Sequence, residues 1–202
     1  MGSEMCIRDS FNSCVERGLE GIIAKDLHER YIAGARKFAW IKLKRSYKGE
    51  LTDTIDVVII GYYKGKGSRA KFGLGTLLAA AYNSEKDVFE SIAKIGSGMT
   101  EEQLAELEKM LSKIVAKKKP ARVFSELEPD YWVEPKYVAE VIADEITKSP
   151  VHSCAKEIMG EGLALRFPRL LKLRVDRKPE QATTTREIIE MYRQQKTHKV
   201  GR

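Results

Sequence analysis

The feature that most constrains the fold is an almost unbroken apolar run, IDVVIIGYY, between Ile55 and Tyr63. Short runs that are rich in valine and isoleucine are typical of a buried strand. Two further runs of this kind follow, LGTLLAAAYN (Leu74–Asn83) and VFESIAKIGSGM (Val88–Met99). The glycine-rich basic segment KGKGSRAKFG (64–73) separates the first two runs and indicates a turn. The sequence therefore predicts consecutive strands between residues 55 and 99.

A helix is predicted directly after these strands, over TEEQLAELEKMLSKIV (Thr100–Val115). Thr100 is a favourable N-cap residue, and Gln103 follows it at the spacing of a capping box. The apolar residues that recur at helical spacing are Leu104, Leu107, Leu111 and Val115. The segment KKKP (117–120) then places cations at the end of the helix, where the helix dipole favours them.

Two more strands are expected beyond the helix. YWVEPKYVAEVIADEI (Tyr131–Ile146) alternates like a strand, although Pro135 restricts it to an edge or a bulge. LALRFPRLLKLRV (Leu163–Val175) is the last strand, and TTTREIIEMYRQQ (Thr183–Gln195) is a terminal helix before a basic tail. Strands, a helix and two more strands are the element order of a five-stranded OB-type barrel, so we predict a mainly β fold with an inserted helix.

A smaller strand pair is predicted near the N-terminus, from LEGIIAKDL (Leu19–Leu27) and FAWIKLKRSY (Phe38–Tyr47). The polar segment SYKGELTDT (Ser46–Thr54) indicates a linker. We expect four parts in the chain. They are a candidate tag or assembly scar (1–10), a short N-terminal part (11–47), the barrel (48–185), and a C-terminal helix with its tail (186–202).

Charge and composition narrow the class of partner. The chain has 36 Lys and Arg against 29 Asp and Glu, which gives a formal net charge of +7. This excess favours nucleic acid as a partner and, second, an anionic membrane surface, with an ordinary basic surface as the alternative. The scattered 3 cysteines and 3 histidines argue against a disulfide framework or a zinc site and fit a reducing compartment. No apolar run has the length of a membrane span, and the N-terminus lacks the apolar segment of a secretory signal.

The strand predicted around Trp40 carries lysines at alternate positions. Because side chains alternate between the faces of a strand, Lys42 and Lys44 project to the same side as Trp40. Two ammonium groups at this spacing repel each other unless an anion lies between them. The pattern fits an anion site, and an amphipathic strand with solvated lysines fits it equally well.

Several segments, in this order along the chain, resemble the ATP-dependent DNA ligases of the covalent nucleotidyltransferase superfamily. LEGIIAK and YIAGARKFAWIKLKR resemble motifs IV and V, and LALRFPRLLKLRVDRKPEQATTT resembles motif VI and the stretch after it. The sequence between these motifs resembles the OB domain of the archaeal and eukaryotic type. The resemblance implies that residues 11–47 are the last strands of an adenylylation domain and that residues 48–185 are an OB-fold domain.

The resemblance assigns roles to the basic residues of motifs IV and V. In this family a lysine attacks the α-phosphate of ATP, AMP passes to a DNA 5′-phosphate, and the 3′-hydroxyl of the nick displaces AMP. Lys42 and Lys44 would neutralise charge that develops on the α-phosphate. Arg36 and Lys25 would contact the nucleotide, and Glu20 would help to hold Mg²⁺, which prefers oxygen ligands.

Motif VI and the basic turn complete the implied site. Arg174 and Asp176 match the arginine and aspartate of motif VI, which would close over the β- and γ-phosphates and later swing away about a hinge at Ser46–Glu50. Arg177 stands where the family usually has lysine, and the two residues are not equivalent at phosphates. The cations expected to contact the DNA backbone are Lys64, Lys66, Arg69 and Lys71.

The implied cofactors are ATP and Mg²⁺, and the implied partner is nicked double-stranded DNA, with a sliding clamp as a further candidate. A monomer in the cytoplasm is expected, nucleoid-associated in an archaeon or nuclear in a eukaryote, that acts in replication, repair and recombination without contact with a membrane.

The family's nucleophile is not found in these 202 residues, because no lysine begins a K-x-D-G motif. We therefore expect a C-terminal part of a ligase that cannot charge itself with AMP. Two other functions stay open. One is a stand-alone OB-fold module that binds DNA without catalysis. The other, less favoured, is an RNA ligase or capping guanylyltransferase, which shares the lysine-rich motif V.

Overall fold

The computed structural model describes residues 3–17, 19, 21–28, 40–44 and 54–200. The chain divides into two compact units, Met1–Tyr47 and Lys48–Arg202, and each is described by itself. No helix in the described part is long and apolar enough to cross a membrane.

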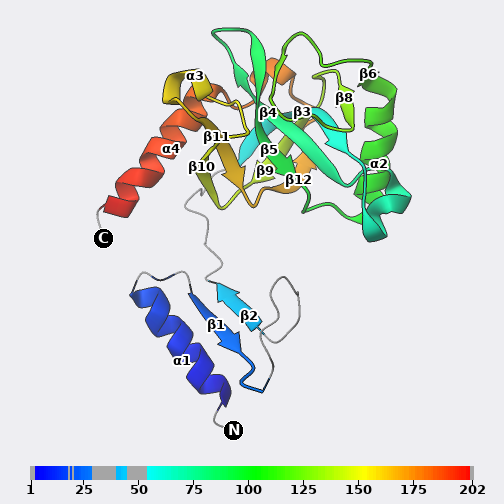
Figure 1. The fold of residues 1–202 in the computed structure, drawn as a ribbon. Coiled ribbons are helices and arrows are strands. Elements are labelled where there is room, and N and C mark those ends of the chain that lie inside the picture. The colour runs from blue at the N-terminus through cyan, green and yellow to red at the C-terminus, as the bar shows by residue number, and fades with distance from the viewer. Residues whose placement is uncertain (1–2, 18, 20, 29–39, 45–53, 201–202) are drawn as a thin grey trace. The chain divides into compact units, whose positions relative to one another are not determined.

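The first unit contains a helix and a hairpin (Figure 1). α1 (Ser3–Glu16) was not predicted, and it includes part of the segment that we interpreted as a candidate tag. β1 (Gly21–Lys25) and β2 (Trp40–Lys44) pair antiparallel, which confirms the two predicted strands. The hairpin is thin, and its described apolar residues Ile23 and Ile41 stay about half exposed, at 48% and 49%.

The second unit is built around a strongly curved sheet whose main strands are β3 (Ile55–Tyr63), β4 (Thr76–Asn83), β5 (Val88–Ile95), β9 (Val138–Ile142) and β12 (Arg169–Leu173). β3 pairs antiparallel with β4 on one side and with β9 on the other. β4 continues to β5, and β9 continues to β12.

The sheet closes on itself where β5 meets β12. A parallel bridge joins Ser97, just after β5, to Arg169 at the start of β12. The order around the sheet is therefore β3, β4, β5, β12, β9 and β3 again, with a helix between β5 and β9. This is the connectivity of the predicted OB barrel.

Two segments that we predicted as single strands are each divided. Residues 131–146 form β8 (Tyr131–Val133), β9 and the start of β10 (Glu145–Ser149), because the chain turns at Pro135 and again at Asp144. Residues 163–175 form β11 (Gly162–Arg166) and β12, which are separated by Phe167 and Pro168. β10 and β11 pair with each other in a separate two-stranded sheet of the described chain.

α2 (Glu101–Leu111) confirms the predicted helix and its N-terminal capping box. The Thr100 hydroxyl accepts from the Gln103 backbone N–H at 3.2 Å, and the Gln103 side chain accepts from the Thr100 N–H at 2.9 Å. The predicted apolar face is buried at Leu104, Leu107 and Leu111. The prediction was wrong at Val115, because a 3-10 turn (Ser112–Ile114) ends the helix and Val115 begins β6 (Val115–Ala116) with its side chain exposed.

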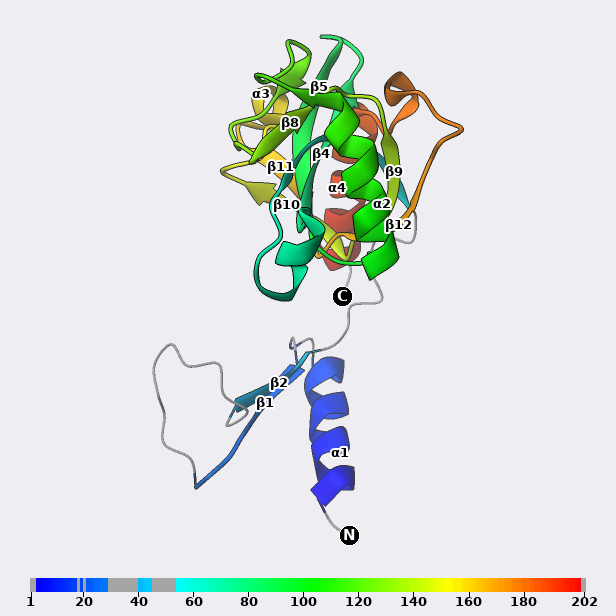
Figure 2. The same ribbon diagram turned by 90° about the vertical axis from the view of Figure 1, so that its right-hand side faces the viewer.

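α4 (Thr185–Val200) confirms the predicted C-terminal helix, and it lies on the opposite side of the barrel from α2 (Figures 1 and 2). It packs against β10 and β4 and contributes Ile188, Ile189 and Tyr192 to the core. The remaining short elements are η1 (Gly67–Phe72), β7 (Val123–Phe124), α3 (Lys156–Met159) and η3 (Pro179–Gln181).

The curved sheet is buried on both of its faces. The larger apolar cluster fills the barrel under α2 and α4, and it includes Ile55, Val57 and Leu77. A smaller cluster on the outer face includes Val58, Ile60 and Phe89. Burial on both faces explains why IDVVIIGYY is apolar at almost every position.

Candidate functional site

The β1–β2 hairpin brings the lysine positions of the first unit together by register. Ile23 is paired with Lys42, Gly21 with Lys44, and Lys25 with Trp40. Directly paired residues in an antiparallel ladder share a face, so Lys25, Lys42 and Lys44 occupy positions on one face of the hairpin. This placement fits an anionic ligand such as a nucleotide phosphate. The side chains of Lys42 and Lys44, and the residues Glu20 and Arg36, lie outside what the structure describes.

Arg174 lies just after β12 at the centre of a group of carboxylates, which we call the Arg174 cluster (Arg174, Asp56, Glu140 and Asp176). Its Nε and Nη2 donate to the two carboxylate oxygens of Asp176 at 2.9 and 2.8 Å. Its Nη1 donates to Asp56 on β3 at 3.4 Å and to Glu140 on β9 at 3.3 Å. Arg174 and Asp176, which the sequence singled out, are therefore bound to each other, and the sequence did not indicate the other two carboxylates.

Pairing tunes the ionisation of this cluster. The hydrogen bond from Arg174 lowers the pKa of Asp176 from 3.8 to about 2, and Asp176 in turn raises the pKa of Arg174. Burial of Glu140 raises its pKa, but hydrogen bonds from Lys172 and Thr54 and the nearby charges more than offset this, so its pKa lies below 4.5. The carboxylates of Asp176 and Glu140 are thus ionised near neutral pH.

Arg177 is anchored next to the same cluster. Its Nη1 lies 2.7 Å from Asp56 Oδ2, the oxygen that also accepts from Arg174, and it donates to the Gln181 carbonyl at 3.3 Å. Further along, Glu180 of η3 accepts from Arg122 at 2.8 Å. The segment 174–181 is therefore held to the barrel at both ends.

The basic turn does not present four equivalent cations. Arg69 is half-buried, and its Nη1 donates to the backbone carbonyls of Gly75 and Gly96, so this guanidinium holds η1 against the ends of β4 and β5. Lys71 pairs with Glu101 at 3.1 Å and also lies over the Phe72 ring. Lys64 and Lys66 are exposed, and the Lys64 ammonium lies 5.3 Å from the centre of the Tyr131 ring.

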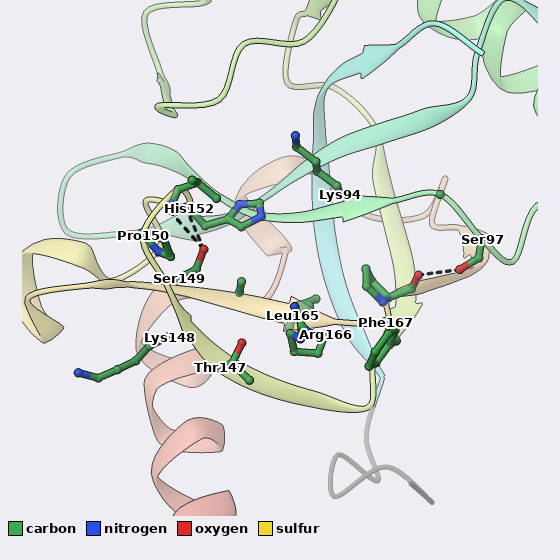
Figure 3. Close-up of a pocket in the computed structure, with 14 residues that line it drawn as sticks. Lys94, Ser97, Thr147, Lys148, Ser149, Pro150, His152, Leu165, Arg166 and Phe167 are labelled. Carbon is green, nitrogen blue, oxygen red and sulfur yellow. Dashed lines mark hydrogen bonds between the residues drawn. The ribbon is translucent and has the colours of Figure 1, made fainter. Parts of the chain in front are cut away.

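A groove that the sequence did not indicate lies between β10, β11 and the end of β5, with a cavity volume of about 600 Å³ (Figure 3). Its cationic lining residues are Lys94, Lys148 and Arg166. Lys148 pairs with Glu161 at 2.8 Å, while Lys94 lies 4.6 Å from the centre of the Tyr63 ring. The groove therefore combines positive charge with hydroxyl groups and apolar surface.

Phe167 stands at one end of this groove, in the turn between β11 and β12. Its side chain is 58% exposed, and its φ of 50° lies in the left-handed region, which is unusual for a bulky residue. The Arg166 guanidinium lies 5.3 Å from the centre of the Phe167 ring. An exposed aromatic ring on strained backbone beside a cation is typical of a binding surface rather than of a core. The signal in the sequence was the phenylalanine between Arg166 and Pro168 in an otherwise alternating strand.

His152 forms the inner wall of the groove, where its ring points from the turn after β10 toward the strand that carries Lys94 (Figure 3). The close packing at this wall depends on Gly162, because a Cβ there would lie 1.6 Å from the His152 carbonyl oxygen. Burial, and then the charge of Lys94, lower the pKa of His152 to about 4, so the imidazole is neutral at physiological pH. Within the described residues, no three His, Cys, Asp or Glu side chains gather in a way that could hold a metal ion.

The family model for the ATP-dependent DNA ligase C-terminal region matches residues 70–177. This segment runs from η1 through the barrel to the Arg174 cluster. The chain belongs to this family. Among curated relatives, a probable DNA ligase of Dictyoglomus thermophilum is 55% identical over 195 residues, and DNA ligases of Hyperthermus butylicus and Thermoplasma volcanium are each 50% identical over 190 and 191 residues.

These relatives are much longer than the chain. The alignments cover 96%, 92% and 92% of the chain but only 34%, 31% and 32% of the relatives, so the chain spans about a third of their length. Among solved structures, the ligase domain from M. tuberculosis LigD matches with a TM-score of 0.50 and 28% identity, covering 86% of this chain and 50% of that chain. The predicted family and the OB-fold class of the C-terminal part of an ATP-dependent DNA ligase are confirmed.

Proposed function

We propose that this chain provides the C-terminal part of an enzyme that seals nicks in duplex DNA through enzyme–AMP and DNA–adenylate intermediates. The observation that carries the proposal is the match of residues 70–177 to the ligase C-terminal family, flanked by the motif IV and V text on one side and continuing into the motif VI residues on the other. Family membership alone does not fix a function, so the residues must supply the chemistry.

The β1–β2 hairpin is the proposed nucleotide side. Lys25, Lys42 and Lys44 would bind and neutralise the phosphates of ATP, with Arg36 as a further contact and Glu20 as the carboxylate for Mg²⁺. Fixed cations stabilise the charge that develops on a transferring phosphoryl or nucleotidyl group without reorganisation during the reaction. When bound, Mg²⁺ would supply further charge neutralisation at the phosphates. Arg174 and Arg177 would contact the β- and γ-phosphates from the OB side, and Asp176 would orient Arg174.

The groove beside Phe167 is the proposed DNA side. Lys94 and Arg166 would contact the phosphate backbone, and the exposed Phe167 ring offers a flat apolar surface to sugars or bases, a combination that OB folds use for nucleic acid. Lys64 and Lys66 would add backbone contacts. Arg69, which is bound to two carbonyls, and Lys71, which is paired with Glu101, are better suited to holding the turn in place.

Finer parts of the expected function belong to the same proposal. These are action in replication, repair and recombination, a sliding clamp as a partner, and a monomer in the cytoplasm or on the nucleoid. A DNA-binding OB module without catalysis is the second candidate. The groove favours it, because its cations and its aromatic ring could bind DNA without a bound nucleotide.

Binding to a nicked duplex tests the DNA side. We expect affinity to fall steeply as salt rises, because bound phosphates release counterions. Replacing both Lys94 and Arg166 with Ala should reduce the dependence on salt, whereas Phe167→Ala should weaken binding and leave that dependence nearly unchanged. The control Lys113→Ala removes an exposed cation near the end of α2, outside the groove. If the two variants bind as tightly as the control and the wild type, with the same dependence on salt, the groove is not the DNA surface.

Intact mass measurement after incubation with ATP and Mg²⁺ tests the nucleotide side. We expect no AMP adduct on the 202-residue chain, because it has no K-x-D-G motif. An adduct would show that another lysine acts as the nucleophile and would overturn the assigned roles.

A further inference from the structure

The Arg174 cluster raises a question for any role of Arg174 at phosphates. An arginine has five N–H donors, and four hydrogen bonds from Arg174 already go to Asp56, Glu140 and Asp176. In this arrangement the guanidinium cannot form a two-point contact with a phosphate. Its side chain is also only 20% exposed, whereas Asp176 is 61% exposed.

Together with its neighbours Lys172 and Arg177, the cluster contains as much negative as positive formal charge. Lys172 lies 3.4 Å from Glu140, and Arg177 lies 2.7 Å from Asp56, so three carboxylates face three cations. A polyphosphate that approaches Arg174 therefore meets the field of a neutral group rather than of a free cation. Asp56 and Glu140 are the least exposed members, with side-chain exposures of 8% and 13%, so solvent screens them less than it screens Asp176.

The carboxylate of Asp56 is only partly satisfied. Its Oδ2 accepts from both Arg174 and Arg177, while its Oδ1 is buried and has no hydrogen-bond partner among the described residues. A buried oxygen without a donor costs free energy, and here the energy of Asp56 depends on its two arginines. Moving Arg174 away would leave Asp56 with Arg177 alone, so the cluster resists release of Arg174.

We infer that Asp56 and Glu140 are positioning residues that hold Arg174 on the barrel and withhold it from phosphate until Arg174 is exchanged from their carboxylates to the ligand. This inference rests on the proposed function, in which Arg174 contacts the β- and γ-phosphates. Arg177, with a side chain 41% exposed and a single carboxylate contact, is available to the ligand before Arg174, whose side chain is 20% exposed. Arg174 binds second, and Asp56 and Glu140 determine how readily.

The test is a titration of the chain with inorganic pyrophosphate, followed by the NMR signals of the arginine Nε–H groups and by calorimetry. In the wild-type chain, the Arg177 signal should shift at lower pyrophosphate concentration than the Arg174 signal. Glu140→Gln should bind pyrophosphate about fivefold more tightly, because one negative charge beside the ligand is removed. Adding Arg174→Ala to that variant should abolish the gain.

Glu85→Gln is the matched control. It also removes one carboxylate and frees an arginine, Arg186, from its ion pair, but on a different surface. It should change pyrophosphate affinity by less than about twofold. Should Glu140→Gln fail to fold, as judged by its thermal melt, Asp56→Asn replaces it, and the wild-type order of the two signals needs no variant.

The inference is overturned if Arg174 and Arg177 shift together in the wild-type chain, if Glu140→Gln gains no more than Glu85→Gln, or if the gain persists without Arg174. The titration contains neither DNA nor ATP. A negative result therefore leaves nick sealing untouched, and a failure of nick sealing leaves this result interpretable.

Discussion

Burial and ion pairing shift the pKa values of individual residues of this chain, and His152 shows the effect of burial. Its folded pKa is about 4, against 6.5 for an ordinary histidine. Between these two pH values His152 is protonated in the unfolded chain but neutral in the native chain. The free energy of unfolding therefore falls as the pH drops from about 6.5 to about 4, and below about pH 4 this contribution stays constant. The full shift corresponds to about 3 kcal/mol.

Replacing His152 with Leu should remove this part of the pH dependence, whatever it does to the absolute stability. The free energy of unfolding, from urea denaturation at several values between pH 7 and pH 4, should fall less steeply in the variant. His28→Leu changes an exposed histidine and should keep the wild-type slope. Equal slopes in all three proteins would contradict the assigned state of His152.

Asp176 shows the effect of pairing, and here too stability falls as the pH drops. Its pKa is lowered from 3.8 to about 2, so its ion pair with Arg174 stabilises the native state above about pH 4 and is lost as the pH falls toward 2. Asp176→Asn should therefore make stability less sensitive to acid in this range, as measured by thermal melts at pH 4, 3 and 2. A variant that is as sensitive to acid as the wild type would show that the pair adds nothing.

At the level of elements, the sequence predicted those features that depend on local chemistry. The capping box of α2 was readable because Thr100 and Gln103 need only be three residues apart. The division at Phe167 was not readable, because it depends on a left-handed φ at a residue that rarely adopts it. Arg69 looked like a free cation because its hydrogen-bond partners cannot be identified from the sequence. Its carbonyl partners, Gly75 and Gly96, meet it only after β4 and β5 have paired.

The capping box gives a direct test at this scale. Thr100→Ala should destabilise the chain by about 1 kcal/mol, because the Gln103 backbone N–H loses its acceptor, the Thr100 hydroxyl, and the capping box is broken. Ser68→Ala, an exposed substitution in η1, should change stability by less than about 0.5 kcal/mol. Urea denaturation of both variants checks this, and equal midpoints would mean that the helix end contributes nothing.

For the whole molecule, the order of strands and helix was enough to predict the barrel, because OB connectivity follows from element order. The Arg174 cluster was not predictable, since Asp56 and Glu140 are 118 and 34 residues away from Arg174 along the chain and meet it only through the register of the sheet. The groove was not predictable from the sequence for the same reason, because Lys94 and Arg166 belong to separate hairpins.

The two units differ in how much apolar surface they bury, which predicts unequal protection. Every residue from Ile55 to Tyr62 is buried, whereas none of the described residues of the first unit is fully buried. Amides of β1 and β2 should therefore exchange with deuterium much faster than those of β3 and β4. Equally slow exchange in both units would contradict this difference.

The most direct test of the central claim is nick sealing by a chimera, in which this chain replaces the matching third of the Hyperthermus butylicus DNA ligase. We predict that the chimera seals a nicked duplex with ATP, and that replacing both Lys42 and Lys44 with Ala abolishes sealing while DNA binding persists. The parent enzyme is the positive control. A folded chimera that binds DNA but never seals it, or sealing that survives loss of both lysines, would contradict the proposal that this chain supplies phosphate-binding residues of a DNA ligase.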